Sequence, residues 1–491
     1  MRYLRPLVLI LGSIGSIASC NAQNSRPSRP TVMRPPVYNT DPERANHIVE
    51  AFKHSWYGYY KYAYPRDTLH PLTETFENDG NSFGATAFDS LTTAIIMGDA
   101  AIVNRILSYI TSVNFTFTKK VREDVNVFRS TVRYIGSMVS ASDLLNGPFK
   151  YLGATESQKK ALLDQATNLA DMLKISFDTK SLIPCANIRL SPKRTRTDFF
   201  RNTLAGAGSL FLEWIMLAER TGLKNYEDFT HKAFRKILRL PKLEDEVVPG
   251  LFPERLNTNE GAFFGSKGGW TEPSSAFYKA MIKLYNLNPK DFSGSGTRWL
   301  EAAGSTYSFD MAGMVPYGDS YTCSVGGSFI YGGAIFKRQD YIDFGLALTE
   351  TCWSIAKSMP AGLPPHEFRW VDAELTPNTP RNPLAPPEYE DLAAETGIWP
   401  VNPEYRLRGD VFESMYYAYR MTGDTMWQDR AWDLFKRINA TCRVDNGFTG
   451  LRDVTVKGGR DLQGNKVEKH SLLLNRMEPA WMSETLKYLY L

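Results

Sequence analysis

Two arginines four residues apart, Arg129 and Arg133, stand in the segment VFRSTVRYIGSMVSASDLL at residues 127–145. On a helix this spacing places both side chains on the same face of consecutive turns. Two neighbouring guanidinium groups could bind carboxylate or phosphate oxygens, because each offers a fork of N–H donors. The ordinary alternative is a solvated helix face, where most arginines lie. The spacing alone leaves both interpretations open.

The composition indicates a large folded protein. The chain has 491 residues, of which 43% are hydrophobic and 13% are aromatic, enough for a large buried core. Its 57 basic and 53 acidic residues leave a net charge of only +4, and the sequence has neither a polybasic run nor an acidic tail. The charge pattern therefore gives no indication of a nucleic-acid partner.

The N-terminus has the features of a secretory signal peptide, with basic residues, an apolar run from Leu7 and a cleavage site after Ala22. We expect a signal peptide at 1–22, a disordered Pro/Ser/Arg-rich spacer at 23–43 and a folded body at 44–491. An uncleaved anchor, or a bacterial lipoprotein box ending at Cys20, are the alternatives. No second run of 18 apolar residues follows, so we expect no stable membrane insertion after signal removal. The expected location is the ER lumen or the cell exterior.

The remaining cysteines and the sequons suit an oxidising compartment. Four cysteines follow Cys20, an even number: Cys185, Cys323, Cys352 and Cys442. No CxxC motif or Cys/His cluster occurs, so the sequence does not indicate a zinc site. Asn114 and Asn439 begin Asn-x-Thr sequons and are candidate glycosylation sites.

Apolar residues recur three and four positions apart, which predicts amphipathic helices. The longest such segments span residues 41–64, 84–110, 156–177, 203–222, 341–359 and 409–438. They come in pairs, and loops rich in glycine and proline separate the pairs. The pattern predicts a large all-α protein whose long loops carry function.

A series of segments follows, in order, the pattern of one enzyme family. The segments are AFKHSWYGYYKYAYPRDTLHPL, SFGATAFDSLTTAIIMGD, VFRSTVRYIGSMVSA, LAGAGSLFLEWIMLAERTG, GLFPERLNTNEGAF, CSVGGSFIYGGA, LTETCW, AGLPPHEFRW, YRLRGDVFESMYYAYRMTGD and MEPAWMSETLKYLYL. From about residue 45 onward the chain resembles the class I α-1,2-mannosidases, glycoside hydrolase family 47. The resemblance implies an (α/α)7 barrel of helical hairpins with the active site inside. It also implies a disulfide between Cys323 and Cys352, which would stabilise the fold by about 3 to 4 kcal/mol.

The resemblance marks the positions of the family's acid and base catalysts. A glutamate that serves in acid catalysis stands where this chain has Arg129, and the family segment DSYYEYLLK reads SAFYKAMIK here, which places Ser275 at a catalytic aspartate. Inverting hydrolysis needs one carboxyl group to protonate the leaving oxygen and a second to activate water. A guanidinium, whose pKa lies above about 12, cannot exchange protons near neutral pH. Ordinary α-1,2-mannosidase activity is therefore not expected.

Other positions depart from the family pattern or keep it. The base motif LRPE reads Leu407-Arg408-Gly409-Asp410, so the carboxylate remains but is one methylene shorter, a displacement that can cost about 10²-fold in rate. Gly206 and His366 match family glutamates, and Asn475 matches an aspartate. These changes remove negative charge, which makes an anionic ligand conceivable. The chain also stops at Leu491, before the strand with the family's calcium-binding threonine, so we expect no metal and no other cofactor.

The candidate site residues follow from these matches. Asp410, Glu413 and Arg129 are the candidates for catalysis, and the candidates for substrate binding are Arg133, Glu213, His366, Arg408 and Glu478. The alternative is that the charged members only neutralise one another as buried salt bridges. His366 could equally be an ordinary hydrogen-bonded histidine.

Three functions remain open at this point. The first is a repurposed non-hydrolytic enzyme, such as a cyclase, isomerase or tailoring enzyme, acting on a small molecule in specialised metabolism. The second is a catalytically inactive protein that binds a glycan or glycoprotein. The third is a weak α-1,2-mannosidase that uses Asp410 and a substitute acid. We expect the first and, in each case, a small-molecule or glycan ligand inside the barrel.

Overall fold

The computed structural model describes residues 38–491 apart from 199, 242–247, 249, 266, 309–314, 373–375 and 380–381. The expected signal peptide at 1–22 and most of the expected spacer at 23–43 lie outside these residues. At the start of the described chain, the Tyr38 hydroxyl donates a hydrogen bond to the carbonyl of Arg420. The Asp41 side chain caps α3 (Pro42–Tyr62), which thus begins just before the boundary expected at residue 44.

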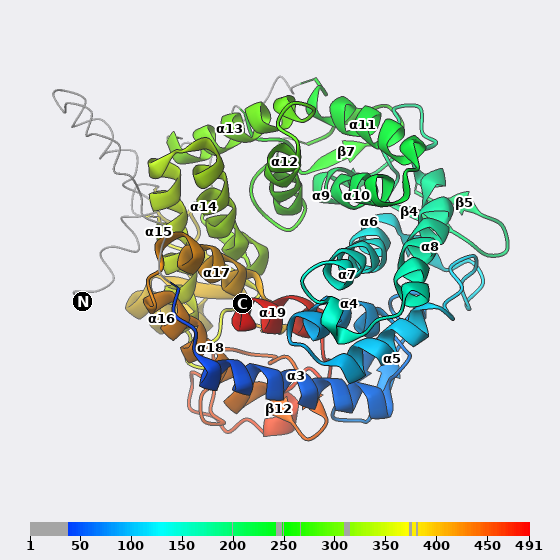
Figure 1. The fold of residues 1–491 in the computed structure, drawn as a ribbon. Coiled ribbons are helices and arrows are strands. Elements are labelled where there is room, and N and C mark those ends of the chain that lie inside the picture. The colour runs from blue at the N-terminus through cyan, green and yellow to red at the C-terminus, as the bar shows by residue number, and fades with distance from the viewer. Residues whose placement is uncertain are drawn as a thin grey trace.

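Seven helical pairs form two concentric rings, as Figure 1 shows. The inner ring consists of α4 (Ala85–Ile96), α7 (Gly136–Asn146), α10 (Phe211–Thr221), α12 (Ser275–Leu287), α14 (Val325–Phe336), α17 (Asp410–Thr422) and α19 (Leu486–Tyr490). The outer ring consists of α5 (Ala100–Ile110), α8 (Glu156–Leu173), α11 (Lys224–Leu238), α13 (Ser293–Ser308), α15 (Gln339–Ser358), α18 (Met426–Cys442) and α3. Because α19 packs on α3, the two ends of the described chain close the ring. The expected (α/α)7 barrel is confirmed.

Each predicted helical segment contains at least one helix, but several divide at glycines. The segment at 84–110 forms α4 and α5, and the segment at 409–438 forms α17 and α18, with Gly423 in a left-handed conformation at the end of α17. The segment at 203–222 divides into α9 (Leu204–Gly208) and α10. These breaks turn long periodic stretches into the hairpins of the barrel.

Glycines allow α14 and α15 to pack against each other at very short range. A β-carbon on Gly326 would lie 2.8 Å from the carbonyl oxygen of Gly345, and one on Gly345 would lie 2.6 Å from the oxygen of Gly326. Real side chains do not fit at such distances, so backbone meets backbone here. This glycine seam joins an inner helix directly to its outer partner.

Short antiparallel strands decorate the loops between the helices. Three of the sheets have three strands: β3 (Asp124–Asn126), β4 (Asn187–Arg189) and β5 (Thr195–Arg196); β6 (Asn202–Thr203), β7 (Arg255–Asn257) and β8 (Ala262–Phe263); and β9 (Tyr317–Asp319), β10 (Glu367–Trp370) and β11 (Ile398–Asn402). Two-stranded sheets are formed by β1 (Thr68–His70) with β2 (Thr75–Glu77) and by β12 (Arg443–Val444) with β13 (Gly447–Phe448). The strands hold the loops that carry several of the candidate site residues.

Two π-helical turns flank the inner helix α4. They are η1 (Thr131–Ile135), which follows α6 (Val127–Ser130), and η8 (Trp481–Thr485), which precedes α19. The other short helices are η2 (Lys150–Leu152), η3 (Lys174–Phe177), η5 (Ser320–Ser324), η6 (Pro387–Tyr389), α16 (Glu390–Thr396) and η7 (Lys469–Leu472). Single π-helical turns inside helices are frequent at functional sites.

The covalent predictions can be compared with the structure at several positions. Cys323 and Cys352 form a disulfide that joins η5 to α15, which confirms the implied pairing, while Cys185 and Cys442 are free and buried. Asn114 is exposed, and Asn439 lies within α18. Glycosylation of either asparagine stays a prediction. Within the described residues, no helix has both the length and the apolar character needed to span a membrane.

Candidate active site in the barrel

Ten charged residues of the inner helices and the segments next to them interact with one another across the ring. We call them the inner charge cluster: the cations Arg133, Lys279, Lys283, Arg408 and Lys487, and the carboxylates Asp89, Glu213, Asp410, Glu413 and Glu484. With every member ionised, the two signs balance. Protonation of Glu213, whose pKa burial raises to about 7, would leave an excess of one positive charge.

Arg133 is neutralised by a residue that the sequence analysis did not single out. Its Nε lies 3.0 Å from Oδ2 of Asp89, and the pair joins η1 to α4. Burial raises the pKa of Asp89 to about 6, although the guanidinium of Arg133 acts in the opposite direction. At neutral pH the carboxylate is thus mainly ionised, and the pair is a partly buried salt bridge.

Arg129 has different surroundings from Arg133. Its side chain is exposed, and among the described residues no hydrogen bond or ion pair engages its guanidinium; only its backbone N–H donates, to Oδ1 of Asn126 at 2.8 Å. The expectation that the two arginines share one stripe stays a prediction. The π-helical turn at Thr131–Ile135 departs from regular α-helical spacing between them. Position 129 presents a cation to solvent.

Helix α12 contributes one serine and two lysines. Ser275 is buried at the first residue of the helix, so the position that matches a catalytic aspartate has no carboxyl group. One turn later, Nζ of Lys279 lies 2.8 Å from Oε2 of Glu413 on α17. Burial alone lowers the pKa of Lys279, but Glu413 and Asp410 together outweigh burial and raise the pKa overall. In the same way Lys279 and Lys283 overcome the effect of burial and lower the pKa of Glu413.

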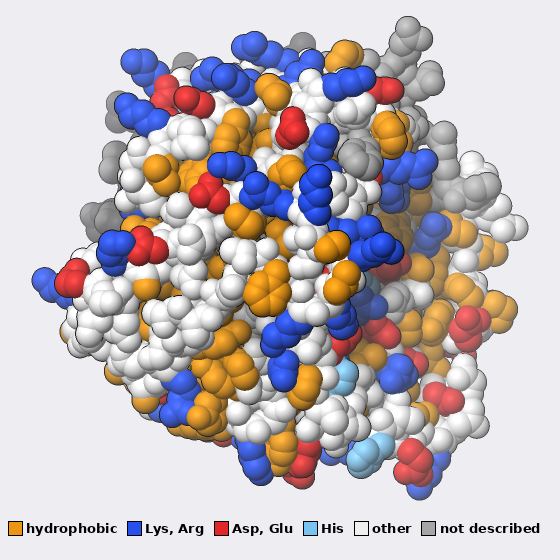
Figure 2. All heavy atoms as spheres, turned by 90° about the vertical axis from the view of Figure 1, so that its right-hand side faces the viewer, with side chains coloured by type: hydrophobic (Ala, Val, Ile, Leu, Met, Phe, Trp, Pro, Cys, Tyr) orange, Lys and Arg blue, Asp and Glu red, His pale blue; other side chains and the backbone are white. Residues whose placement is uncertain are grey.

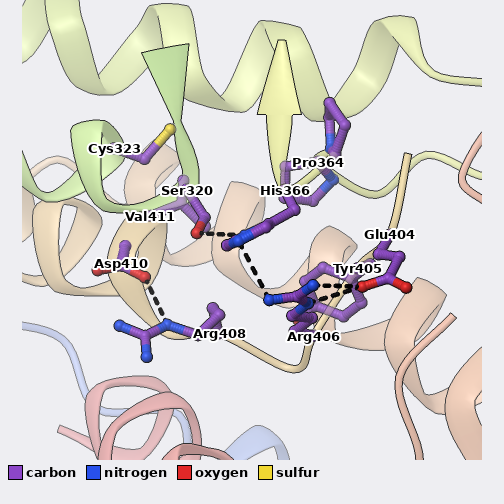
Figure 3. A pocket seen from close by; sticks show the side chains of 11 residues that line it. Ser320, Cys323, Pro364, His366, Glu404, Tyr405, Arg406, Arg408, Asp410 and Val411 are labelled. Carbon is purple, nitrogen blue, oxygen red and sulfur yellow. Dashed lines mark hydrogen bonds and ion pairs between the residues drawn. The ribbon is translucent and has the colours of Figure 1, made fainter. Parts of the chain in front are cut away.

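Asp410, the base that the sequence resemblance predicts, is a buried carboxylate. It is buried as the first residue of α17, and Nε of Arg408 donates to its Oδ2 at 3.1 Å, as Figure 3 shows. The plane of the Arg408 guanidinium lies over the ring of Tyr321, with Cζ 4.2 Å from the ring centroid. Its Nη2 lies 3.8 Å from Oε2 of Glu484. Arg408 thus fixes the direction of the Asp410 side chain.

A small cleft opens beside Asp410, with about 330 Å³ of empty space when the volume is counted out to open solvent. Figure 3 shows the side chains that line it, among them Ser320, His366, Arg406, Arg408 and Asp410. Ser320 lies in η5, His366 lies just before β10, Arg406 and Arg408 lie in the segment before α17, and Asp410 is the first residue of α17. The sequence-predicted residues that the structure brings together here are His366, Arg408 and Asp410.

The hydrogen bonds of His366 determine what its ring can do. Nη1 of Arg406 donates to Nε2 at 3.3 Å, which makes Nε2 an acceptor and leaves the proton of the neutral ring on Nδ1. Nδ1 lies 3.1 Å from the hydroxyl of Ser320 and therefore donates to it. Burial and Arg406 both lower the pKa of His366, which keeps the ring neutral. Ser320 is consequently not activated by a histidine base, and serine acyl-transfer chemistry is excluded for this pair.

Glu213 is the one carboxyl group of the cluster with a fully buried oxygen that lacks a hydrogen-bond partner in the described structure. Its Oε2 is buried and has no hydrogen-bond partner among the described residues. Burial raises its pKa to about 7, and the positive charge of Lys283 limits the rise. Near neutral pH a large fraction of Glu213 is therefore protonated and can donate a proton.

Glu478 lies outside this cluster. Its Oε1 accepts from Nε of Arg476 at 2.6 Å, and the same guanidinium also binds Glu77 and Asp79. This group ties the segment before η8 to β2 and to the loop that follows it. None of its members lines the cleft beside Asp410.

Five members of the cluster were missed in the sequence: Asp89, Lys279, Lys283, Glu484 and Lys487. Asp89 is the only charged residue within ATAFDSLTTAII, and Glu484 and Lys487 stand in the aromatic segment WMSETLKYLY. Charges in such apolar surroundings are costly unless they are paired, which is the signal that could have found them. Lys279 gave no such signal, because a lysine on an amphipathic helix is normally solvated.

The calcium ion that the resemblance implies does not fit the described residues. Calcium takes six to eight oxygen ligands, mostly from carboxylates and carbonyls. Within the described part of the chain, no group of three or more His, Cys, Asp or Glu side chains could hold a metal ion. Asp89, Asp410 and Glu413 each already have an arginine or lysine partner. We therefore assign no step to a metal.

Comparisons with known proteins agree over almost the whole chain. Residues 51–491 match the family described as glycosyl hydrolase family 47. A mannosyl-oligosaccharide alpha-1,2-mannosidase 1B of Aspergillus oryzae is 36% identical over 470 residues, which cover 92% of this chain and 87% of that protein. The mannosyl-oligosaccharide alpha-1,2-mannosidase of Penicillium citrinum is 35% identical, with coverages of 89% and 88%. The solved structure of an alpha-1,2-mannosidase from Trichoderma reesei is similar with a TM-score of 0.85 and 34% identity, covering 92% of this chain and 93% of that one.

Proposed function

Because the chain belongs to glycosyl hydrolase family 47, we propose that its barrel binds a mannosyl oligosaccharide in the secretory pathway and hydrolyses its α-1,2 linkage only weakly. The observation that carries the proposal is the contrast between two catalytic positions. Asp410 keeps a buried, oriented carboxylate in the wall of the cleft, while position 129 offers an exposed guanidinium. The base side of the reaction is retained, and the ordinary acid is absent.

Weak hydrolysis requires a substitute acid, and Glu213 has the matching protonation state. Two carboxyl groups whose surroundings push their protonation apart are the usual signature of an acid and base pair. Asp410 accepts from a guanidinium and serves as the base that activates water. Glu213, with a pKa of about 7, is the carboxyl group that we assign as the proton donor; it lies outside the lining of the cleft and would have to reach the sugar from the barrel wall.

A neutral sugar is the ligand that the charges favour. With Glu213 protonated as the acid, the cluster has an excess of only one positive charge, so a ligand with a large net charge would gain little from it. Sugar hydroxyls can both donate to carboxylates and accept from arginine and lysine. The relatives described above are named as mannosyl-oligosaccharide α-1,2-mannosidases, which supports α-linked mannose over other sugars.

The two other functions have less support. To favour a repurposed enzyme, the site would need side chains that differ from those of the mannosidases and that fit another substrate. Among the described residues, the cleft beside Asp410 provides no such side chains. A purely glycan-binding protein differs from our proposal only in lacking turnover. The expected secretory location agrees with the disulfide between Cys323 and Cys352, which suits an oxidising compartment.

The test combines binding and long incubation with α-1,2-linked mannosyl oligosaccharides. We expect binding by calorimetry and slow release of mannose by chromatography. Asp410→Asn should abolish release but keep binding, and Arg129→Glu should raise release about tenfold to 10²-fold, because a general acid contributes rate factors of this kind. The exposed Arg235→Glu on α11 is the matched control and should leave both unchanged.

Each outcome separates one part of the proposal from the rest. If no α-1,2-linked oligosaccharide binds, the proposed ligand class is wrong. If mannose release persists in Asp410→Asn, the assigned base is wrong. Binding without any release, even after Arg129→Glu, would leave a glycan-binding protein and remove the catalytic part.

A further inference from the structure

A second feature of the molecule, away from the barrel interior, carries unpaired charge. Five cations lie on two neighbouring loops: Lys119, Lys120, Arg122, Lys193 and Arg194, and all five are exposed. Two exposed hydrophobic side chains lie on the first of these loops, Phe117 with 47% and Val121 with 70% of its surface accessible. We call residues 117–122 together with Lys193 and Arg194 the basic ridge. Figure 2 faces this side of the barrel and shows basic and hydrophobic side chains intermingled across its middle.

Hydrogen bonds through Ser191 join the two loops into one platform. The backbone N–H of Arg122 donates to the Ser191 carbonyl at 3.1 Å, and that of Thr118 donates to the Ser191 hydroxyl at 3.3 Å. Beyond this point the chain continues as the sheet of β3, β4 and β5, in which Val125 is paired with Ile188 and both are buried. The ridge is therefore anchored in the core rather than carried by independent loops.

The charges of the ridge are not neutralised locally. Of the acidic groups nearest in sequence, Asp124 is engaged by Arg189 at 2.7 Å. Glu123 offsets at most one of the five positive charges, because burial raises its pKa while the charge of Lys120 lowers it. Among the described residues, none of the five cations of the ridge makes an ion pair; Arg194 instead donates to the backbone carbonyl of Asp171 at 2.9 Å. The ridge thus presents a positive potential to whatever lies outside it.

From these contacts we propose that the basic ridge docks the protein on an anionic membrane surface. The loop places Val121 directly between Lys120 and Arg122, so an aliphatic side chain can enter the headgroup region while the flanking cations meet lipid phosphates. The hairpin that ends in β5 projects from the outer side of the barrel in Figure 1. A projecting surface can contact a flat membrane, whereas a linear peptide or polymer would need a groove that encloses it. A soluble polyanion would use the cations but would gain nothing from exposed Val121 and Phe117.

The experiment measures binding to vesicles of phosphatidylcholine alone and with about one third phosphatidylserine, by co-sedimentation in about 0.1 M salt. We expect binding only to the anionic vesicles. Replacing three cations, Lys119→Gln with Lys120→Gln and Arg122→Gln, should weaken the partition coefficient by about two orders of magnitude, since each basic residue near such a surface contributes about 1 kcal/mol and 1.4 kcal/mol is tenfold. Val121→Ser should weaken it several-fold. Lys457→Gln with Lys466→Gln, both exposed and distant in sequence, is the matched control.

Two outcomes would overturn the proposal. Equal binding to both kinds of vesicle, or to neither, removes the anionic surface as partner. Binding to heparin that is lost with the three cations but insensitive to Val121→Ser, without vesicle binding, assigns the ridge to a soluble polyanion instead. The measurements are repeated in an Asn114→Gln background, because a glycan at Asn114 would lie three residues from Phe117 and could shield the ridge. Far-UV circular dichroism of every variant verifies folding.

Discussion

The inner charge cluster and the basic ridge differ in whether their cations are paired with carboxylates. Inside the ring, Arg133, Lys279 and Arg408 each have a carboxylate within 3.1 Å. On the ridge, five cations have no such partner among the described residues. The difference follows from solvent: water stabilises an exposed ammonium or guanidinium, whereas a buried one must find its counter-charge in the protein. On the surface, a cluster of unpaired cations therefore indicates a binding site. Inside the barrel, a carboxyl oxygen without a hydrogen-bond partner indicates a residue that is a candidate for catalysis.

Breaking an inner pair should have the largest effect. Asp89→Asn leaves the partly buried Arg133 without its counter-ion, and we expect a loss of about 2 to 4 kcal/mol in the free energy of unfolding, measured with urea at pH 7.5. The double variant Asp89→Asn with Arg133→Met should recover much of this loss. As a control, Asp164→Asn breaks the exposed pair with Lys160 and should cost less than about 1 kcal/mol. Similar costs for the buried and exposed pairs would refute the comparison.

Glu213 should make stability depend on pH in a defined direction. Its folded pKa of about 7 lies above the unfolded value of 4.5, so the folded state binds the extra proton between these values and stability falls as pH rises through them. Glu213→Gln removes this dependence, and relative to it the wild type should lose about 3 kcal/mol between pH 4 and pH 8. Urea titrations of both proteins at the two pH values measure it. Parallel pH profiles of wild type and variant would contradict the assigned burial.

Lys487 should act with the opposite dependence and a comparable or smaller size. Burial lowers its pKa to about 8, below the usual 10.5, although Glu484 and Asp89 oppose the shift. The unfolded chain binds the extra proton between pH 8 and 10.5, so this residue's contribution to stability rises with pH over that window. Lys487→Met should therefore be more stable than wild type at pH 7, and the advantage should shrink by pH 10. Thermal unfolding at the two pH values would reveal the trend, and a variant that is less stable at pH 7 would exclude it.

The smallest expected effect concerns calcium. Because the inner carboxylates already have cationic partners, adding millimolar calcium or removing it with EDTA should shift the midpoint of thermal unfolding by less than about 1 °C. The Trichoderma-type or Aspergillus-type relatives provide the comparison proteins for the same titration. A calcium-dependent shift of several degrees would show that the cluster rearranges to admit the ion.

The sequence predicted the barrel better than the site within it. Apolar spacing and glycine breaks identify the helices of the hairpins, because each helical turn must place an apolar residue on the buried face. The partner of Arg133 could not be found this way, since it depends on the π-helical turn before α7 and on which residue of α4 faces it. Glu478 shows the same limit: its motif places it near the pocket, but the adjacent Arg476 holds it in another cluster. The disulfide was predictable because both cysteines lie in long, ordered motifs.

The glycine seam between α14 and α15 has a consequence for how such sequences can diverge. Most of the barrel can exchange one apolar residue for another and repack, so drift there is gradual. At Gly326 and Gly345 a single added methyl group would push two helices apart, so variation should be almost absent. Among natural variants of this chain, the two glycines of the seam should stay unchanged while exposed loop residues outside the basic ridge vary freely. A deep mutational scan should show the same difference in tolerance.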